Sequence, residues 1–339
     1  MVIQDAIRAL VERGPLTGPE AAGALEEIMT GNATPAQIGA FLAAMRVRGE
    51  TPEVVAAGLT VMQKHAEPCP ATDVIDICGT GGDGIDTINV STAAGFVVAG
   101  AGVRVAKHGN RAASSKCGSA DVLEALGARI DLGGEQVARV IDRCGFGFLF
   151  AQRFHPAMRH VGGPRREVAV RTVFNILGPL SNPANPRAQL VGVGSRAIGP
   201  VVAEALALRG IGRALVVHSD DGLDEISPAA GTHAWVIGEG AVQERELTAE
   251  DFGLPPHALG SVAGGEAAHN AGEILAILDG IEGAMTDFVL MNAAAALYVA
   301  GKANDFREGV ELGRQSIASG RAREVLDQYI ALSNEAASG

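Results

Sequence analysis

The chain has few of the residues that build disulfide frameworks or zinc sites. It contains four cysteines in 339 residues, and neither a CxxC spacing nor a histidine partner pattern accompanies them. Disulfide-rich and zinc-binding proteins use closely spaced cysteines, so both classes are disfavoured. We therefore expect buried, reduced thiols at Cys69, Cys78, Cys117 and Cys144.

Long apolar runs and an excess of basic residues are also missing. No segment reaches the ~18 to 20 uninterrupted apolar residues of a membrane span, and the N-terminal MVIQDAIRAL lacks the basic-then-apolar order of a signal peptide. The net charge of −12 argues against a general nucleic-acid surface. With 47% hydrophobic and 19% charged residues, the chain is expected to be a soluble, cytoplasmic protein that binds neither membrane nor nucleic acid.

Residues 1–66 predict a small helical domain. Apolar residues keep helical spacing at the N-terminus until Gly14-Pro15 ends the segment. Three helix-start patterns follow, namely Thr17 with Glu20, Thr34-Pro35 with Gln37, and Thr51-Pro52. Four short helices of this kind bury their apolar faces poorly alone, so we expect them to pack on a partner subunit or on the rest of the chain.

After a proline-containing linker at 67–71, strand and helix patterns alternate over residues 72–339. Strands are expected at 74–78, 103–106, 129–132, 146–150, 189–193, 214–218 and 234–237. Helical patterns stand between several of these strands and fill the chain again from about residue 266. Such alternation predicts an α/β domain with a mostly parallel sheet that helices cover on both faces.

The stretch DICGTGGDGIDTINVST, residues 76–92, passes from an apolar strand through glycines into a helix. Glycines let a backbone approach a ligand closely, and Asn89, Ser91 and Thr92 are residue types that cap helices. A loop of free N–H groups at a positive helix end is expected to bind an anion.

The same glycines fit two nucleotide-binding patterns less well. Gly79, Gly81 and Gly84 satisfy G-x-G-x-x-G, but a dinucleotide site expects an acidic residue at the end of the next strand. That strand ends instead in Lys107-His108-Gly109-Asn110-Arg111, and no Gly-Lys-Ser/Thr completes a P-loop. A phosphorylated ligand is the better interpretation.

Three further stretches carry polar chemistry. KHGNRAASSKCGSAD, residues 107–121, combines basic and small residues, which suit phosphate, although a solvated loop that caps a helix at Asp121 is an alternative. The acids at 220–225 follow a strand and suit Mg²⁺ with phosphate oxygens, or form a solvated turn. Between 155 and 186, His155 suits a site, a helix start or the core, and Arg166 is expected to face solvent.

Together these motifs resemble the anthranilate phosphoribosyltransferase family of tryptophan biosynthesis. The resemblance covers nearly the whole chain and rests on GTGGD at 79–83, NVST at 89–92, KHGNRAASSKCGSAD at 107–121, HPAM at 155–158, RTVFNILGPLSNP at 171–183 and DGLDE at 221–225. Ile88 departs from the expected aromatic residue, which affects only local packing. The resemblance implies a nucleoside phosphorylase/phosphoribosyltransferase-like α/β fold, with a helical domain at 1–66 that carries the dimer contact, a segment near 164–184 packed on it, and an α/β domain at 72–339.

The resemblance also implies a reaction and a site. A homodimer would transfer the 5-phosphoribosyl group of 5-phosphoribosyl 1-pyrophosphate (PRPP) to the amine of anthranilate, releasing pyrophosphate, with two Mg²⁺ ions per subunit. The implied PRPP-binding residues are Gly79, Gly82, Asp83, Thr87, Asn89, Ser91, Thr92, Lys107 and Ser119. Those implied for anthranilate are Gly79, Asn110, His155 and Arg165, and those for the metal are Ser91, Asp224 and Glu225. No general base stands out, so catalysis would come from positioning and metal.

Two alternatives remain. A pyrimidine nucleoside phosphorylase has a similar Lys-His-Gly-Asn-Arg loop, but it would use free phosphate and need no paired acids for Mg²⁺. A non-catalytic relative that binds nucleic acid would keep the fold. The NILGPLSNP run disfavours the first alternative, and the net charge of −12 with intact acids disfavours the second.

Overall fold

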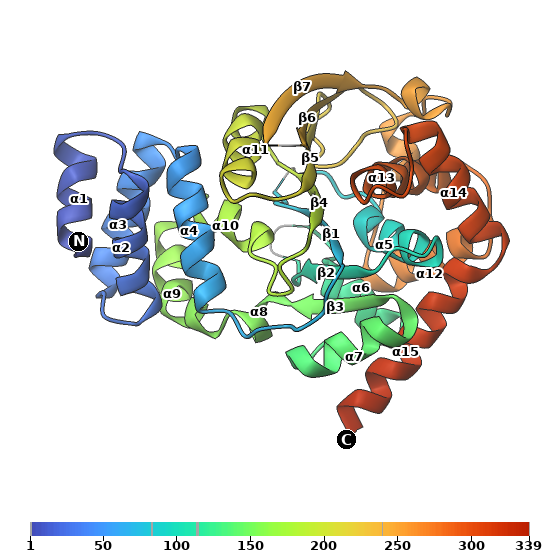
Figure 1. Cartoon of the computed structure of the whole chain (residues 1–339), viewed down its shortest axis with the longest axis horizontal. Coiled ribbons are helices and arrows are strands. Elements are labelled where there is room, and N and C mark those ends of the chain that lie inside the picture. The colour runs from blue at the N-terminus through green and yellow to red at the C-terminus, as the bar shows by residue number, and fades with distance from the viewer. Residues whose placement is uncertain (1, 83, 113–114, 239, 339) are drawn as a thin grey trace.

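Figure 1 shows a computed structural model of the chain, which describes residues 2–82, 84–112, 115–238 and 240–338. Four helices open the chain: α1 (Ile3–Glu12), α2 (Gly18–Met29), α3 (Pro35–Arg48) and α4 (Pro52–Lys64). The predicted helix starts are confirmed, because the Thr17 N–H donates to Glu20 and the hydroxyls of Thr34 and Thr51 accept backbone N–H groups in the first turn. Pro35 and Pro52 stand at the first helical position, where no N–H is needed.

Within the described residues, seven strands form one sheet in the order β3-β2-β1-β4-β5-β6-β7. Their bounds are β1 Ile75–Gly79, β2 Val105–Gly109, β3 Phe146–Phe150, β4 Ala188–Gly192, β5 Arg213–Ser219, β6 Thr232–Gly238 and β7 Ala241–Leu247. The five strands from β3 to β5 run parallel, whereas β6 is antiparallel to both of its neighbours. The predicted mostly parallel sheet is therefore confirmed.

One predicted strand is absent from the described residues, and one observed strand was not predicted. The segment 129–132 is an extended loop, because its backbone bonds to side chains of α15 (Arg321–Ser338) rather than to a strand: the Arg129 N–H donates to Ser333 and the Arg129 carbonyl accepts from Tyr329. Strand β7 was not expected, since its residues are mostly polar. It forms by pairing with β6 at the edge of the sheet, where only one ladder is required.

Helices cover both faces of the sheet. The remaining ones are α5 (Val90–Gly100), α6 (Ser119–Ala125), α7 (Gly134–Cys144), α8 (Ala151–Phe154), α9 (Arg159–Val168), α10 (Phe174–Leu180), α11 (Gly199–Leu208), α12 (Ala267–Leu278), α13 (Ala284–Val299) and α14 (Phe306–Ala318). On one face Phe96 of α5 packs on Phe146 of β3, with ring centroids 4.3 Å apart. On the other, Ile141 of α7 closes over Gly147 of the same strand. None of the described helices is long and apolar enough to cross a membrane.

The N-terminal helices bury their apolar faces against the rest of the chain. One hydrophobic cluster joins α1–α4 to α9, α10, α11 and a face of β4 and β5. Figure 1 shows α10 on the side of α4 that faces the sheet, and α9 contacts α2 and α3. Gly58 of α4 allows the closest approach, because a Cβ there would lie 2.9 Å from Leu177 of α10 and 3.1 Å from Leu25. All four cysteines are buried.

The close packing at Gly58 predicts an unusual effect of Gly58→Ala. Alanine normally stabilises a helix interior by about 1 kcal/mol relative to glycine. Here the added methyl group overlaps Leu177, so we expect a net loss of about 1 kcal/mol in the free energy of unfolding, measured by urea denaturation. Gly39→Ala in α3 is the matched control, because its Cβ would make an ordinary 3.6 Å contact with Val168. Equal stabilisation by both substitutions would contradict this account.

Candidate functional site

The candidate site lies at the carboxyl edge of the parallel strands. The glycine loop follows β1, the Lys107 to Asp121 loop begins within β2, and the acidic turn follows β5. Carboxyl ends of parallel strands meet at one edge of a sheet, which is where α/β proteins bind ligands. The register places the last residue of β1, Gly79, beside Gly192 of β4.

A carboxylate and a guanidinium both form hydrogen bonds with the backbone of the glycine loop. The Gly81 N–H donates to Oδ2 of Asp224 at 2.6 Å, and the Gly81 carbonyl accepts from the Arg171 guanidinium at 2.8 Å. Gly81 and Gly82 have φ of +62° and +75°, which side chains rarely adopt, and a Cβ on Gly82 would overlap Arg171. A Cβ on Gly79 would likewise overlap the Asp224 carboxylate. The contact with Asp224 therefore favours glycine at Gly79, whereas the positive φ favours it at Gly82.

The prediction that the glycine loop presents free backbone N–H groups is wrong in part. The Gly81 N–H is taken by Asp224, and the Thr80 N–H donates to the Gly192 carbonyl at 2.9 Å. An anion that binds the Gly81 amide must therefore replace the Asp224 carboxylate. Thr87 lies further along and forms an isolated bridge with Ala263. Asp83, also expected in this loop, lies outside the described residues.

Helix α5 begins at Val90, and none of the three expected capping side chains caps it. Asn89 is the N-cap residue, but its side chain donates to the Cys117 carbonyl at 3.0 Å and accepts from Asn270 at 2.9 Å. Ser91 lies in the first turn and its hydroxyl accepts from Lys107 at 3.1 Å. Thr92 is fully buried, and its hydroxyl has no hydrogen-bond partner among the described residues. The structure thus joins Ser91 to Lys107 by a hydrogen bond and gives no such bond to the Thr92 hydroxyl among the described residues.

Lys107 is a buried cation at the centre of this edge. It is 2% exposed, and its ammonium donates to the Ile77 carbonyl at 2.7 Å as well as to Ser91. Burial lowers the pKa of Lys107, and the carboxylates of Asp76, Glu225 and Asp224 oppose that shift. The electrostatic contacts place Lys107 near both acids of the turn after β5.

Only Lys107 among the described basic residues of its loop is directed to this edge. Arg111 forms ion pairs with Asp121 and Glu124. The Lys116 ammonium lies 3.7 Å from Oδ2 of Asp86. Helix α6 begins at Ser119 rather than at the predicted Asp121, because Asp121 accepts the N–H groups of Gly118 and Ala112 from the third helical position. The alternative of a solvated basic loop thus holds for Arg111.

Asn110 and Ser119 lie together next to the end of β2. The Ser119 hydroxyl donates to the Asn110 carbonyl at 3.2 Å. Oδ1 of Asn110 accepts from its neighbour's N–H at 2.8 Å and from Gln152 at 3.3 Å. The Asn110 side chain is exposed and its amide nitrogen points to no partner within the described ranges, so the amide can donate to a ligand.

His155 forms a buried pair with His108 of β2. The ring centroids are 5.1 Å apart in an edge-to-face arrangement. Burial lowers the pKa of His108 to about 3 and that of His155 to about 4, so both rings are neutral at pH 7. Nε2 of each ring lacks a hydrogen-bond partner among the residues described. His155 is thus buried like a core residue, and its neutral ring has a nitrogen without a hydrogen-bond partner among the described residues.

Arg165 of α9 is a half-buried cation without a carboxylate partner in the described part of the chain. Its guanidinium donates to Asn175 at 3.3 Å and lies 5.9 Å from the centre of the Phe174 ring. Burial lowers the pKa of Arg165. No hydrogen bond within the described ranges joins Arg165 to His155 or Asn110, whereas its neighbour Arg166 is exposed as expected.

The four acids of the turn after β5 lie in two different surroundings. Asp220 pairs with His233 at 2.9 Å, and Asp221 accepts from the Ser227 hydroxyl at 2.5 Å. Asp224 and Glu225 are the two acids near Lys107. Among the residues that the structure describes, no three His, Cys, Asp or Glu side chains form a ready metal cluster. Mg²⁺ needs only one or two carboxylates when substrate phosphates supply other oxygens, so Asp224, Glu225 and Ser91 suit it.

Several residues of the site escaped the sequence analysis. Arg171 lies within a recognised motif, but its contact with Gly81 spans 90 residues and has no local signal. Asp76 is a charged residue inside an apolar strand, which could have marked it; its Oδ1 accepts the His108 N–H at 3.1 Å. Burial raises the pKa of Asp76, and Lys107 opposes that shift. Asn270, which holds Asn89, had no signal at all.

Comparison with known proteins assigns both parts of the chain. Residues 4–66 match the helical bundle domain of the glycosyl transferase family, and residues 71–323 match the a/b domain of that family. The anthranilate phosphoribosyltransferase of Anaeromyxobacter dehalogenans is 51% identical over 332 residues, which are 97% of this chain and 98% of the relative.

Two solved structures have the same architecture. The anthranilate phosphoribosyltransferase of Thermus thermophilus superposes with a TM-score of 0.92 at 42% identity, covering 97% of this chain and 99% of the other. The enzyme of Saccharomyces cerevisiae, solved in complex with PRPP and Mg, gives 0.90 at 29% identity and covers 98% of both chains.

The buried histidine pair predicts a loss of stability in mild acid. Below pH 6.5 the unfolded state binds protons at both histidines, whereas the folded state does not until about pH 4 and about pH 3. The free energy of unfolding should therefore fall as the pH drops from 6.5 to 4, by on the order of 1.4 kcal/mol per pH unit for each histidine. His155→Gln should remove one histidine's share of that slope, measured by urea denaturation across this range. An unchanged slope would contradict the buried, neutral state of His155.

Proposed function

Because the chain belongs to the anthranilate phosphoribosyltransferase family, we propose that it transfers the 5-phosphoribosyl group of PRPP to the amine of anthranilate, giving N-(5-phosphoribosyl)anthranilate and pyrophosphate. The observation that carries this proposal is the convergence of Lys107, Asp224 and the glycine loop at one sheet edge. A buried cation beside carboxylates and a close-contact glycine loop suits a charged, metal-binding donor such as PRPP.

In the proposed reaction the chain stabilises the leaving pyrophosphate. Breaking the C1–O bond of PRPP leaves positive charge on the ribose and negative charge on pyrophosphate. Lys107 and the loop from Gly79 to Gly82 would surround that charge, together with Ser119 and the start of α5. Asp224 would release the Gly81 amide when the donor binds. Mg²⁺, two ions per subunit, would neutralise the phosphate oxygens and be held by Ser91, Asp224 and Glu225.

The acceptor would be held by residues that carry no negative charge. Arg165, a cation without a carboxylate partner among the described side chains, would pair with the anthranilate carboxylate. Asn110 would donate to the acceptor, and His155 would offer a neutral ring nitrogen. An aromatic amine is already neutral and nucleophilic at pH 7, so positioning suffices and no general base is assigned.

We also propose that the protein acts as a cytoplasmic homodimer through the helical unit at residues 1–66, with residues 72–339 as the α/β unit. Helices α1 and α9 both contact α3. Val11 of α1 and Val47 of α3 are 61% and 83% exposed, and Val170 lies just after α9 with 52% exposure. Large exposed apolar residues on adjoining helices are typical of an interface between subunits. Sedimentation as a compact monomer at micromolar concentration would contradict the dimer.

Arg165→Ala tests the acceptor assignment. Losing a charge-assisted pair with the anthranilate carboxylate should raise the apparent KM for anthranilate at least tenfold, because such bonds contribute about 1.5 to 3 kcal/mol. The KM for PRPP should change less than twofold in steady-state assays. Arg166→Ala is the matched control, since its exposed side chain should affect neither value. Equal losses for both substrates would remove Arg165 from this role.

Replacing both Asp224 and Glu225 by their amides tests the metal assignment. Asp224→Asn with Glu225→Gln should move the Mg²⁺ dependence of turnover to at least tenfold higher concentration, because carboxylates are the preferred protein ligands of Mg²⁺. Asp220→Asn, in the same turn but paired with His233, should leave the titration unchanged. A Mg²⁺ titration that is the same in all three proteins would reassign the two acids to a structural turn.

Pyrophosphate release distinguishes the proposed function from its alternatives. With PRPP and Mg²⁺, release should require anthranilate. A phosphorylase would instead cleave pyrimidine nucleosides with free phosphate, and a non-catalytic relative would release nothing.

A further inference from the structure

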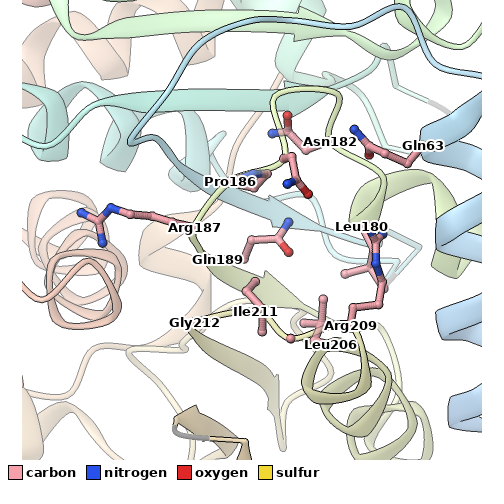
Figure 2. Close-up of a pocket in the computed structure, with 12 residues that line it drawn as sticks. Gln63, Leu180, Asn182, Pro186, Arg187, Gln189, Leu206, Arg209, Ile211 and Gly212 are labelled. Atoms are coloured by element: carbon pink, nitrogen blue, oxygen red, sulfur yellow. The ribbon is translucent and has the colours of Figure 1, made fainter.

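A half-open cavity of about 350 Å³ lies at the end of the sheet opposite the reaction edge (Figure 2). Its walls are formed by Gln63 of α4, residues of the 180–187 segment, Gln189 near the start of β4, and residues from α11 to the start of β5. The parallel strands begin at this end of the sheet. Its volume is within the range of small-molecule sites. None of the residues assigned to PRPP, anthranilate or metal lines it.

Gln189 brings an unsatisfied amide to this cavity. It is the second residue of β4, and it is 3% exposed on a strand face where the next inward residue is Val191. Its Nε2 atom is buried and has no hydrogen-bond partner among the described residues. Figure 2 shows the Gln189 side chain in the midst of the lining residues, with its amide directed into the space they surround. Buried amides are normally satisfied, so this one calls for an external partner.

Arg209, at the end of α11, adds a half-buried cation. No carboxylate within the described ranges lies at ion-pair distance from it, and burial lowers its pKa. Arg187, the other cation on the wall, differs because it pairs with Asp73 and donates to the Ala300 carbonyl at 3.0 Å. In Figure 2 the Arg187 guanidinium points away from Gln189. Of the two described cations on the wall, Arg209 is therefore the one available to a ligand.

Beside these donors the wall carries the polar side chains of Gln63, Asn182 and Asn185 together with three aliphatic ones. Leu180, Leu206 and Ile211 line it together with Gln189 and Arg209. We propose that this cavity is a second ligand site, which takes a small carboxylate with an apolar body: the carboxylate oxygens accept from Arg209 and Gln189, and the body packs on the three aliphatic side chains. Specific sites commonly combine apolar walls with a few such polar groups.

Hexanoate is the probe, because it has a carboxylate and an aliphatic body and does not resemble the aromatic acceptor. In a ligand-observed NMR titration of the full chain we expect a Kd on the order of 1 mM, as befits so small a molecule. Arg209→Met and Gln189→Leu should each weaken binding at least fivefold. Arg187→Met, which removes the same charge from the same wall, should change the Kd less than twofold. Equal weakening by both arginine variants would mean nonspecific charge attraction and would overturn the proposal.

Three further measurements test which class of ligand the cavity binds and whether hexanoate binds there or in the reaction site. Hexanol should bind at least tenfold more weakly than hexanoate, and inorganic phosphate should not displace hexanoate. Displacement by phosphate would make the cavity a simple anion site and overturn the assigned class. Saturating hexanoate should leave the KM for anthranilate unchanged, whereas competition would place hexanoate in the reaction site and overturn the second site. The binding measurements need no turnover, so they stand or fall separately from the transferase function.

Gln189→Leu also provides its own folding control. Leucine has a similar volume and removes the unpartnered amide, so the ligand-free variant should melt a few degrees higher than the unmodified protein. A variant that melts lower would show that the amide is satisfied within the chain, and would overturn its assigned role.

Discussion

The burial of one lysine constrains the whole reaction edge. A charge removed from water is tolerated only when hydrogen bonds and opposite charges surround it. Lys107 meets that condition through the Ile77 carbonyl, the Ser91 hydroxyl and the nearby carboxylates. Strand β1, helix α5 and the turn after β5 must therefore all converge on Lys107 in β2. The same convergence brings hydrogen-bond donors and carboxylates together at one edge of the sheet.

Most of the fold could be predicted from local patterns. Strand β3 begins and ends where the apolar pattern at 146–150 placed it, and helices α2, α3 and α4 begin at the predicted capping residues. The predictions fail in segments whose structure depends on contacts with other parts of the chain. Residues 129–132 alternate like a strand, yet α15 supplies their hydrogen bonds from some 200 positions away. Strand β7 is too polar to be recognised alone and exists because β6 offers it a ladder.

The position of the site could be predicted, because the carboxyl ends of parallel strands meet at one edge of a sheet. The order of strands and polar loops was enough to bring Lys107, Ser91 and the acids to one edge, and the structure places them there. The pairing within that edge was not predictable, because Asp224 reaches Gly81 across 143 residues. Local capping rules also failed at Asn89, whose side chain is drawn to Cys117 and Asn270 by tertiary contacts that capping preferences do not include.

The polar character of β7 has a consequence for how the molecule behaves among other chains. An open sheet ends in a row of unpaired backbone groups, and a smooth apolar edge would recruit strands from neighbours and seed aggregates. Along β7 the exposed Glu244, Arg245 and Glu246 stand at that boundary. Any strand that approached would have to desolvate these charges. The charges on β7 thus disfavour the addition of further strands at this edge of the folded sheet.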